Sequence, residues 1–331
     1  MKKHYSILFT KTVACALFIS VALLNIQAGC NKAVPAAPPP PTIAALINTG
    51  TNFTVLKAAM VKAGLETTLN GSGTFTVFAP TNNAFATMGI TVASINTLSV
   101  AAVTEIFKYH IINTFAYTLA NFTTTATAVN SMALVNNALY LKLINGAGIV
   151  NGKPLAQANI LASNGVLHVL DEPLGSPTAN VGGPTQNIFN LATADTALKL
   201  FVQAVNKTMG SPNDIKALLT GTTAYTIFAP TNTAFIANGM DSTAIANALP
   251  ATLVSVLQYH TLAGRMFSTY FNNLELLATL NTMPPQPRVF KTTDIAIRGA
   301  ANTSITQAKV EKSNFLATNG VLHVIDKVVK F

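Results

Sequence analysis

Histidine is the residue type whose repetition in this sequence could indicate chemistry, because imidazole carries protons near neutral pH and binds metals. Four of the five histidines fall at matching places in two halves of the chain: His110 and His168 in the first, His260 and His323 in the second. Each half offers only two, and no cysteine or acidic residue lies near either at ligand spacing. Zinc and copper sites need a fuller ligand set, so we predict no metal site.

The surroundings of these histidines favour a structural role. Val103, Ile106 and His110 have helical i, i+3, i+7 spacing, so the histidine continues the apolar stripe of a helix. The second half repeats this pattern. His168 and His323 each lie in a strand that is apolar on both faces. A histidine in such a place is usually a buried, hydrogen-bonded core residue.

The carboxylates form no catalytic pattern. The chain holds 11 acidic residues, and those that recur between the halves are Asp171 and Asp326, each at the end of a predicted strand. A glycosidase needs two facing carboxylates in one site. The sequence also has no nucleophile elbow, phosphate-binding glycine loop or dinucleotide fingerprint. We therefore predict that the protein is not an enzyme, with no catalytic residues and no cofactor.

The elements that would position these residues occur twice. Residues 74–85 return 150 residues later as residues 224–235. In both copies an apolar or β-branched run ends in Ala-Pro, which predicts a buried strand that stops there, because proline cannot donate a ladder hydrogen bond. The Thr-Asn that follows is typical of a helix N-cap.

Other patterns repeat in the same order. An amphipathic helix is predicted over residues 53–61 and ends at Gly64, and a second helix leads to the Tyr-His pair. Asn164-Gly165 and Asn319-Gly320 suit a tight hairpin turn with positive φ. The strand that follows is apolar on both faces, which predicts a central strand.

The start of the chain has the features of an exported protein. A basic head, an apolar run and small residues at its end predict a signal peptide over residues 1–29. Ala28-Gly29-Cys30 resembles a bacterial lipobox, which implies lipidation of Cys30; ordinary cleavage nearby is the alternative. The other cysteine, Cys15, lies inside the signal core, so the mature chain has one thiol and no internal disulfide.

Composition and the repeats together divide the chain into five segments. The boundary between the repeats is rich in proline and glycine, as a linker should be. Prolines after Cys30 favour an extended spacer. The predicted segments are a signal peptide over 1–29, a lipidated cysteine and proline-rich spacer over 30–41, a first domain over 42–175, a linker over 176–185 and a second domain over 186–331.

The repeated landmarks resemble those of fasciclin-type (FAS1) domains. These are the Phe-Ala-Pro-Thr strand end followed by Asn-x-Ala-Phe, the Tyr-His pair, and the closing Asn-Gly-Val-Leu-His-Val segment. Many members have Asp where this chain has Asn82 and Asn232, a change that keeps the capping oxygen. The resemblance covers nearly all of residues 42–331. It implies an α+β fold class with two tandem FAS1 domains, each a twisted β-sheet packed with helices.

The resemblance also implies a function. Members of the family are mostly secreted or surface-anchored adhesion and matrix-associated proteins, and their Tyr-His region has been linked to receptor recognition. In this sequence the region maps to Tyr109, His110, Tyr259 and His260, which become candidate recognition residues. A purely structural role of the same residues is the alternative.

Charge distinguishes the two halves. Residues 42–180 hold five basic and four acidic residues, whereas residues 181–331 hold eleven and seven. The basic residues gather late in the second half, where an anionic partner such as a glycan could bind; a solvated face is the alternative. Arg288, Lys291 and Arg298 are the candidate residues. No basic run with interleaved aromatics points to nucleic acid.

These observations predict a non-enzymatic adhesion or extracellular-binding protein. It would be exported and lipid-anchored at the outer membrane or cell surface, with the periplasmic face as the alternative. Its partners would be the membrane, through the lipid, and an extracellular protein or glycan. Residues 283–287, an irregular loop peculiar to the second half, should make the domains bind differently. The alternative function is an envelope accessory protein that captures a glycan or other ligand for uptake or assembly, which predicts a deep pocket.

Overall fold

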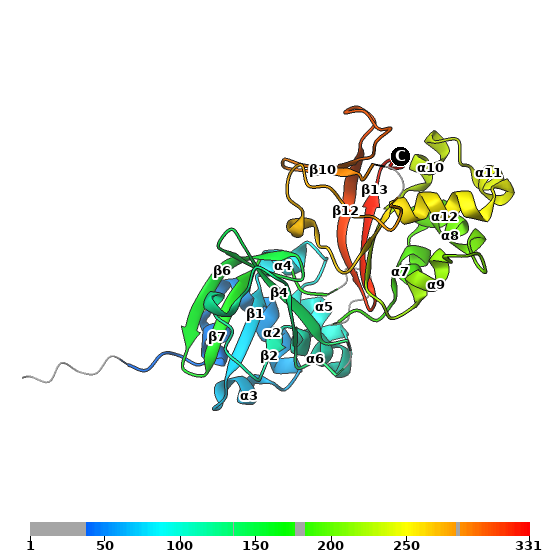
Figure 1. The fold of residues 1–331 in the computed structure, drawn as a ribbon. Helices are drawn as coiled ribbons and strands as arrows, with labels where there is room; N and C mark the ends of the chain where they lie inside the picture. Colours follow the sequence, from blue (N-terminus) through cyan, green and yellow to red (C-terminus); the bar gives the residue numbers. More distant parts are fainter. Residues whose placement is uncertain (1–37, 135, 176–182, 283–284) are drawn as a thin grey trace, which may run out of the picture. The chain divides into compact units, whose positions relative to one another are not determined.

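A computed structural model describes residues 38–134, 136–175, 183–282 and 285–331 (Figure 1). The predicted signal peptide, Cys30, most of the spacer and most of the linker lie outside these residues. Within the described ranges, no helix has the length and apolar character needed to cross a bilayer.

The succession of elements in the first repeat returns in the second, except that the described residues of the second form one strand fewer (Figure 1). The first repeat contains α1 (Ile43–Thr49), η1 (Thr51–Phe53), α2 (Thr54–Lys62), α3 (Glu66–Asn70), β1 (Phe75–Pro80), α4 (Asn82–Ala86), α5 (Val92–Thr97), α6 (Val100–Tyr109), β2 (Ile111–Ile112), η2 (Leu119–Asn121), β3 (Thr127–Asn130), β4 (Ala138–Ile144), β5 (Ala147–Val150), β6 (Lys153–Ala162) and β7 (Gly165–Leu170). The second contains α7 (Ile188–Ala194), η3 (Thr196–Leu198), α8 (Lys199–Lys207), α9 (Ile215–Thr220), β8 (Tyr225–Pro230), α10 (Asn232–Ala237), α11 (Ser242–Asn247), α12 (Pro250–Tyr259), β9 (Thr261–Ala263), η4 (Ser268–Tyr270), β10 (Arg288–Lys291), β11 (Ile295–Arg298), β12 (Ala308–Ala317) and β13 (Gly320–Ile325).

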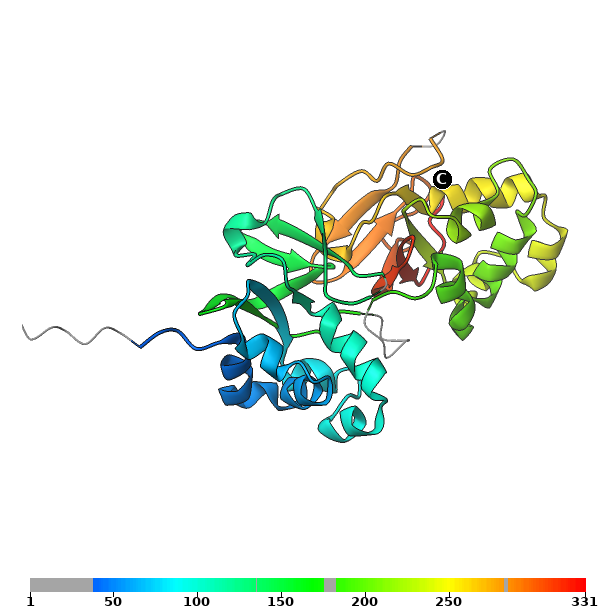
Figure 2. The same ribbon diagram turned by 90° about the horizontal axis from the view of Figure 1, so that it is seen from below.

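A mixed sheet runs through each repeat. The strand order is β2-β1-β7-β6-β5-β4-β3 in the first and β10-β11-β12-β13-β8-β9 in the second. β1 pairs with β7 in parallel, and β8 pairs with β13 in the same way, while the other pairs are antiparallel. The helices of each repeat gather on one side of its strands (Figures 1 and 2). The predicted α+β class, with a sheet packed against helices in each domain, is confirmed.

The repeated motif around residues 74–85 forms the predicted strand and cap. β1 is buried throughout and ends at Pro80, and the side chain of Thr81 caps α4. Asn82 has a different role from the one expected of a cap residue. Its Oδ1 accepts the backbone N–H of Val55, 3.1 Å away, and so joins the start of α2 to the start of α4. In the second repeat Asn232 accepts the N–H of Leu200.

The hairpin between β6 and β7 is confirmed, but its turn lies one residue earlier than predicted. Ser163 and Asn164 form the turn, and Gly165 is already the first residue of β7, with a φ of 152°. A Cβ atom on this glycine would overlap the carbonyl oxygen of Phe75 on the neighbouring strand. Glycine is therefore needed for the close approach of two strands.

Asn164 is buried, and its amide joins the turn to two helices. Its Oδ1 accepts the N–H of Ile43 at 2.9 Å, and its Nδ2 donates to the carbonyl oxygens of Leu69 at 2.9 Å and Gly71 at 2.7 Å. One side chain thereby pairs backbone groups that the ends of α1 and α3 leave unsatisfied. Asn319 makes the equivalent bonds to Ile188, Leu219 and Gly221.

Two apolar cores form on the two faces of each sheet. Residues alternate between the faces of a strand, so β7 contributes Leu167 to the core under the helices and Leu170 to the core on the other face. This confirms that the strand after the hairpin is central. The helix-side core of the first repeat includes Ile47, Met60, Phe85 and Phe107, and the other core includes Phe78, Tyr109, Leu139 and Leu141.

The histidine that follows α6 bonds to two distant backbone groups. His110 is 1% exposed. Its Nε2 accepts the N–H of Leu174 at 2.9 Å, so its proton is on Nδ1, which donates to the carbonyl oxygen of Ile106 at 2.8 Å. The neutral ring thus ties the end of the repeat to α6. His260 makes the same bonds to Val256 and Val329.

The histidine of the central strand is bonded in the same manner. The Nδ1 of His168 accepts the N–H of Asn159, and its Nε2 donates to the carbonyl oxygen of Tyr117 at 2.7 Å. Its ring also stacks on Phe78, with 5.5 Å between the ring centroids. In the second repeat His323 bonds to Asn314 and Met266. All four histidines are therefore neutral and fully bonded in the cores.

We expect Asn319→Ala to lower the free energy of unfolding by about 2–4 kcal/mol, because three backbone groups lose a partner and each is worth about 1 kcal/mol. Urea denaturation of the purified variant measures this. Asn206→Ala, at an exposed position on α8, is the control and should change the value by less than about 0.5 kcal/mol. Equal effects of the two substitutions would contradict the assigned role of Asn319.

Stability should also fall on mild acidification. Burial lowers the pKa of His110, His260 and His323 from 6.5 to about 4, and it lowers the pKa of His168. Below pH 6.5 the histidines of the unfolded chain become protonated. The buried histidines of the folded protein stay neutral until the pH approaches about 4. The stabilisation is therefore complete above pH 6.5 and is lost as the pH falls toward 4.

One such shift corresponds to about 3 kcal/mol, so the free energy of unfolding should drop by at least that amount between about pH 7 and about pH 4. Urea denaturation across this range gives the value. Aspartates with a lowered pKa, such as Asp195 and Asp214, lose most of their contribution below pH 3.8, so they add little to the drop above pH 4. A constant free energy from pH 7 to 4 would show that the histidine assignment is wrong.

Candidate binding surface

The first candidate recognition residues lie inside the fold. Tyr109 is 0% exposed, like the neighbouring His110 at 1%. The Tyr109 hydroxyl donates to the carbonyl oxygen of Ala138 at 3.1 Å and accepts from the Nδ2 of Asn151 at 3.0 Å. Burial raises the pKa of this tyrosine. The hydroxyl thus holds β4 and the turn after β5 against α6.

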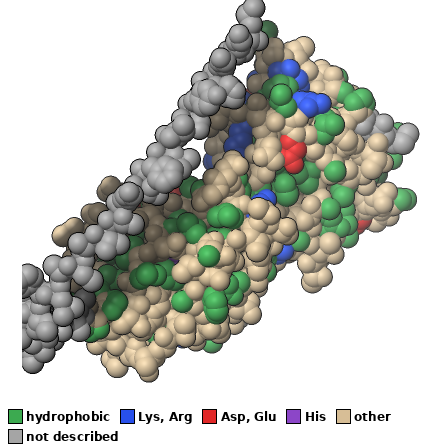
Figure 3. Space-filling model, turned by 60° about the vertical axis from the view of Figure 1, so that its left-hand side comes forward, with side chains coloured by type: hydrophobic (Ala, Val, Ile, Leu, Met, Phe, Trp, Pro, Cys, Tyr) green, Lys and Arg blue, Asp and Glu red, His purple; other side chains and the backbone are tan. Residues whose placement is uncertain are grey.

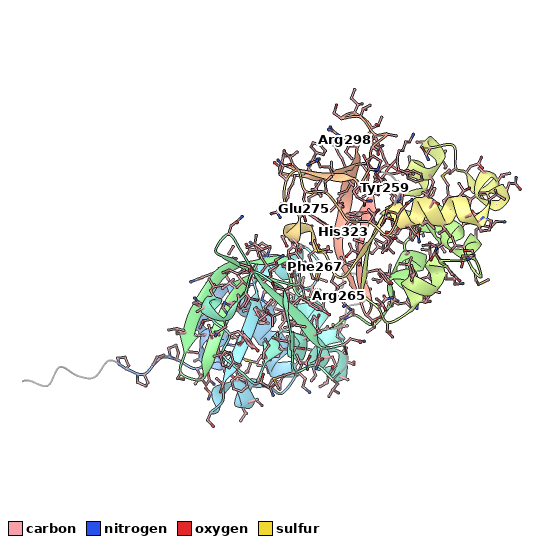
Figure 4. The ribbon with its side chains drawn as sticks, in the orientation of Figure 1. Tyr259, Arg265, Phe267, Glu275, Arg298 and His323 are labelled. Atoms are coloured by element: carbon pink, nitrogen blue, oxygen red, sulfur yellow. The ribbon has the colours of Figure 1, made fainter. Side chains whose placement is uncertain are left out.

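The second Tyr-His pair is placed in the same way. Tyr259 is 1% and His260 is 0% exposed. The Tyr259 hydroxyl donates to the carbonyl oxygen of Pro285 at 2.6 Å and accepts the N–H of Ala300, and burial raises its pKa. Figure 4 shows Tyr259 and His323 in the interior of the repeat. These contacts support the core role of both Tyr-His pairs; recognition of a partner by them stays a prediction.

The predicted loop at 283–287 is described only in part. Residues 283 and 284, like Cys30, lie outside the described residues. The described end of the loop is attached to the core through the bond from Tyr259 to Pro285. It is also attached through Gln286, whose side-chain oxygen accepts the N–H of Thr279 at 2.8 Å.

Arg288 and Arg298 lie directly opposite each other on paired strands. β10 and β11 are antiparallel, with Arg288 facing Arg298 and Phe290 facing Ala296. The alternate residues Val289 and Ile297 belong to the core, so the two arginines belong to the opposite face. β12 adds Lys309, which faces Ala296. We call this set the basic face: Arg288, Phe290, Ala296, Arg298 and Lys309.

The guanidinium groups of the basic face are held by contacts that leave their charge uncompensated. The Cζ of Arg298 lies 3.9 Å from the ring centroid of Phe290, a cation–π contact. The same side chain donates to Gln307 at 2.9 Å, and its buried Nε has no hydrogen-bond partner within the described residues. Arg288 donates to the carbonyl oxygen of Leu274. Like charges placed directly opposite are unfavourable in a sheet.

The cationic side chains of the basic face form no ion pair within the described residues. The ion pairs formed within the described parts of the chain are Lys153–Glu172, Lys312–Asp195 and Lys327–Asp326. None of them includes Arg288, Arg298 or Lys309. Figure 3 shows basic side chains gathered over the second repeat on the side that it presents, with few acidic ones among them. Figure 4 places Arg298 on the strand side of this repeat, away from helices α8 and α12.

Lys291 has a different role from the two arginines. Its Nζ donates to the carbonyl oxygens of Ser268 and Thr269, each at 3.3 Å, and of Phe271 at 3.0 Å. Burial lowers the pKa of this lysine. Its ammonium group closes the end of η4, so its geometry supports a structural role.

Sequence reasoning missed the apolar part of this surface. Leu276 is 56% exposed and forms an isolated antiparallel bridge with Arg288, which places it in the same cross-strand row. Leu274, 51% exposed, has a φ of 66°, unusual for a bulky residue. The alternation of outward and apolar residues over 288–290 and 296–298 was the sequence signal that could have predicted the basic face. Leu276 follows an irregular segment, so no such pattern pointed to it.

A cavity of about 260 Å³ opens elsewhere in the second repeat. Its apolar lining comes from Leu191 on α7, Phe315 on β12 and Leu322 on β13. Lys312 and Asp195 stand at the cavity as an ion pair with 3.0 Å between Nζ and Oδ2. Throughout the described residues, no group of three or more His, Cys, Asp or Glu is arranged to hold a metal.

Comparison with known proteins agrees with the architecture. The pattern of the Fasciclin domain matches residues 51–177 and 196–330. The porcine transforming growth factor-beta-induced protein ig-h3 (Sus scrofa) is 31% identical over 179 residues, which are 54% of this chain and 25% of that protein. Protein sll1483 of Synechocystis is 34% identical over 130 residues, 38% of this chain and 68% of that protein.

A solved structure is also similar. It is a FAS1 domain pair from the insect cell adhesion molecule fasciclin I, with 16% sequence identity and a TM-score of 0.38 over 84% of this chain and 96% of that chain. This chain spans about a quarter of the length of the ig-h3 proteins that it matches. Because the family pattern covers both repeats and well over half of the sequence, the chain belongs to the Fasciclin domain family.

Proposed function

We propose that this chain is a non-enzymatic adhesion or extracellular-binding protein and that the basic face of its second repeat holds an anionic partner. Fasciclin domains occur in cell adhesion and extracellular matrix proteins, and the homologues are secreted or surface proteins. The observation that carries the proposal is the pair Arg288 and Arg298, opposed on β10 and β11 without an acidic partner.

The chemistry of the basic face suits a sulfated or carboxylated polymer. Two guanidinium groups and the exposed Lys309 stand in adjacent cross-strand rows. Guanidinium binds carboxylate and sulfate-like oxyanions through paired N–H donors. The first repeat has a near-neutral charge balance, five basic against four acidic residues over 42–180.

We also propose that the protein is held at a membrane through a lipid on Cys30. The sequence Ala28-Gly29-Cys30 supports this. The proline-rich spacer after Cys30 would extend about 3.1 Å per residue and keep the repeats away from the bilayer. The anchored protein would lie at the outer membrane or cell surface, with the periplasmic face as the alternative.

A second candidate function is ligand capture by an envelope accessory protein. The cavity beside Lys312 favours it, since adhesion through flat surfaces does not require an apolar hollow of about 260 Å³. The two functions are compatible in one chain, because the cavity residues and the basic face share no side chain.

Neutralising both arginines should weaken binding to an anionic polymer. Each exposed charge contact contributes about 0.5–1 kcal/mol, so Arg288→Gln/Arg298→Gln should bind dextran sulfate about tenfold more weakly than the unchanged protein. Affinity should also fall as NaCl rises from about 0.05 to about 0.5 M. Surface plasmon resonance on immobilised polymer measures both effects.

The control for this variant is Lys199→Gln/Lys207→Gln, which removes the same charge from exposed positions on α8. It should bind nearly as well as the unchanged protein, and neutral dextran should bind neither. Equal weakening by the two double variants would mean that net charge, and not the basic face, governs binding.

Removing the cysteine should release the protein from membranes. Cys30→Ala leaves no thiol for a lipid at the predicted cleavage point, so the protein should move from the membrane fraction to the soluble fraction of the producing cells. Immunoblotting of the two fractions measures this. The control is Cys15→Ser, which changes the cysteine inside the predicted signal core. This variant should stay membrane-bound. A Cys30→Ala protein that remains in the membrane would refute lipid anchoring.

A further inference from the structure

The cavity of the second repeat has the composition of a site for a small amphipathic ligand. Its floor is apolar and largely buried, since Leu191 is 8% and Leu322 is 2% exposed. Phe315 forms a further part of the wall. A volume of about 260 Å³ admits a short hydrocarbon chain. Such a chain would gain free energy by leaving water for this lining.

The charged rim of the cavity selects the polar end of the ligand. The side chain of Lys312 is 50% exposed, and its Nζ has three N–H donors, of which one contacts Asp195. Asp195 uses Oδ2 for this pair and Oδ1 for the N–H of Ala197 at 2.9 Å. The lysine therefore keeps donors for an anion, whereas both oxygens of the aspartate are already bonded.

The first repeat carries different residues at the equivalent positions. Gly50 stands where the second repeat has Asp195, and Phe53 stands where it has Leu198. A Cβ on Gly50 would approach Cδ2 of Phe53 to 2.5 Å, so the ring lies against the glycine and excludes a side chain there. Gln157 replaces Lys312.

The two repeats thus differ at Asp195 and Lys312, which line the cavity, and at the nearby position of Leu198. The smaller Leu198 is fully buried, at 0% exposed, and the ion pair replaces the ring and the glycine. The cavity is open to solvent, so its apolar lining faces water. An apolar ligand that displaces this water would bury the lining.

We infer that this cavity binds a small apolar carboxylate, with its hydrocarbon chain against Leu191, Phe315 and Leu322 and its carboxylate at the Nζ of Lys312. Fatty acids of medium length and apolar carboxylates of similar size have this chemistry. The inference rests on the second candidate function, ligand capture at this cavity, and the site is independent of the basic face, so either can fail without the other.

Octanoate is a suitable probe, used with the purified protein in isothermal titration calorimetry. It should bind with one site, whereas octan-1-ol and octylamine, which have the same chain without an anionic head, should bind at least about tenfold more weakly. Chemical-shift changes in ¹³C-methyl NMR spectra should be confined to Leu191 and Leu322 and their neighbours. Octanoate that does not bind, or that shifts other methyl groups, would overturn the inference.

Two variants test the residues. Lys312→Gln, which carries the residue type of the first repeat, should weaken octanoate binding at least about tenfold. Lys327→Gln, which removes another lysine that is paired with an aspartate, is the control and should bind as the unchanged protein does. Equal affinities of the two variants would overturn the role of Lys312.

The double substitution Asp195→Gly/Leu198→Phe transfers the first repeat's arrangement to the second. Because the first repeat folds with this pair, the variant should keep its secondary structure by circular dichroism and lose octanoate binding. A folded variant that binds octanoate with unchanged affinity would show that the ligand occupies another place.

Discussion

The parallel pairing of β1 with β7, and of β8 with β13, is the constraint on which each repeat depends. The paired strands are buried except at the first residues of β7 and β8, and they have a core on each face. A parallel pair requires a long crossover, and in this fold the crossover supplies the intervening helices and the antiparallel strands. Close approach at the start of the pair requires Gly165, where a Cβ would meet the carbonyl oxygen of Phe75.

Buried polar groups hold the ends of this arrangement in place. Asn164 pairs backbone groups of two helices with the hairpin, and His110 pairs α6 with the end of the repeat. An unpaired buried donor or acceptor is costly, so such a network is stabilising only when it is complete. The landmarks that make the sequence recognisable therefore serve the fold, and their polar atoms have partners.

Function is consequently expected where the two repeats differ. The duplicated fold tolerates variation at outward strand faces and at the contact between η3 and β12, since these places carry none of the buried network. There the second repeat has opposed arginines on β10 and β11 and an ion pair beside a cavity. The first repeat has Gly50 and Phe53 in place of Asp195 and Leu198. Duplication allows one copy to carry an ion pair at a cavity where the other copy has different residues.

The sequence by itself determined the duplication, the strand that ends at Pro80, the helix before the Tyr-His pair and the central strand after the hairpin. These follow from hydrophobic periodicity and from proline, which act locally. It also singled out Arg288 and Arg298, although it grouped them with Lys291. Only the tertiary structure showed that these residues have different roles. Cross-strand register places the two arginines opposite each other, whereas the lysine binds carbonyl oxygens at η4. The same holds for Asn82, Asn164 and the cavity beside Lys312: their partners lie far away in sequence, and a pattern of neighbours carries no information about contacts that exist only after the chain has folded.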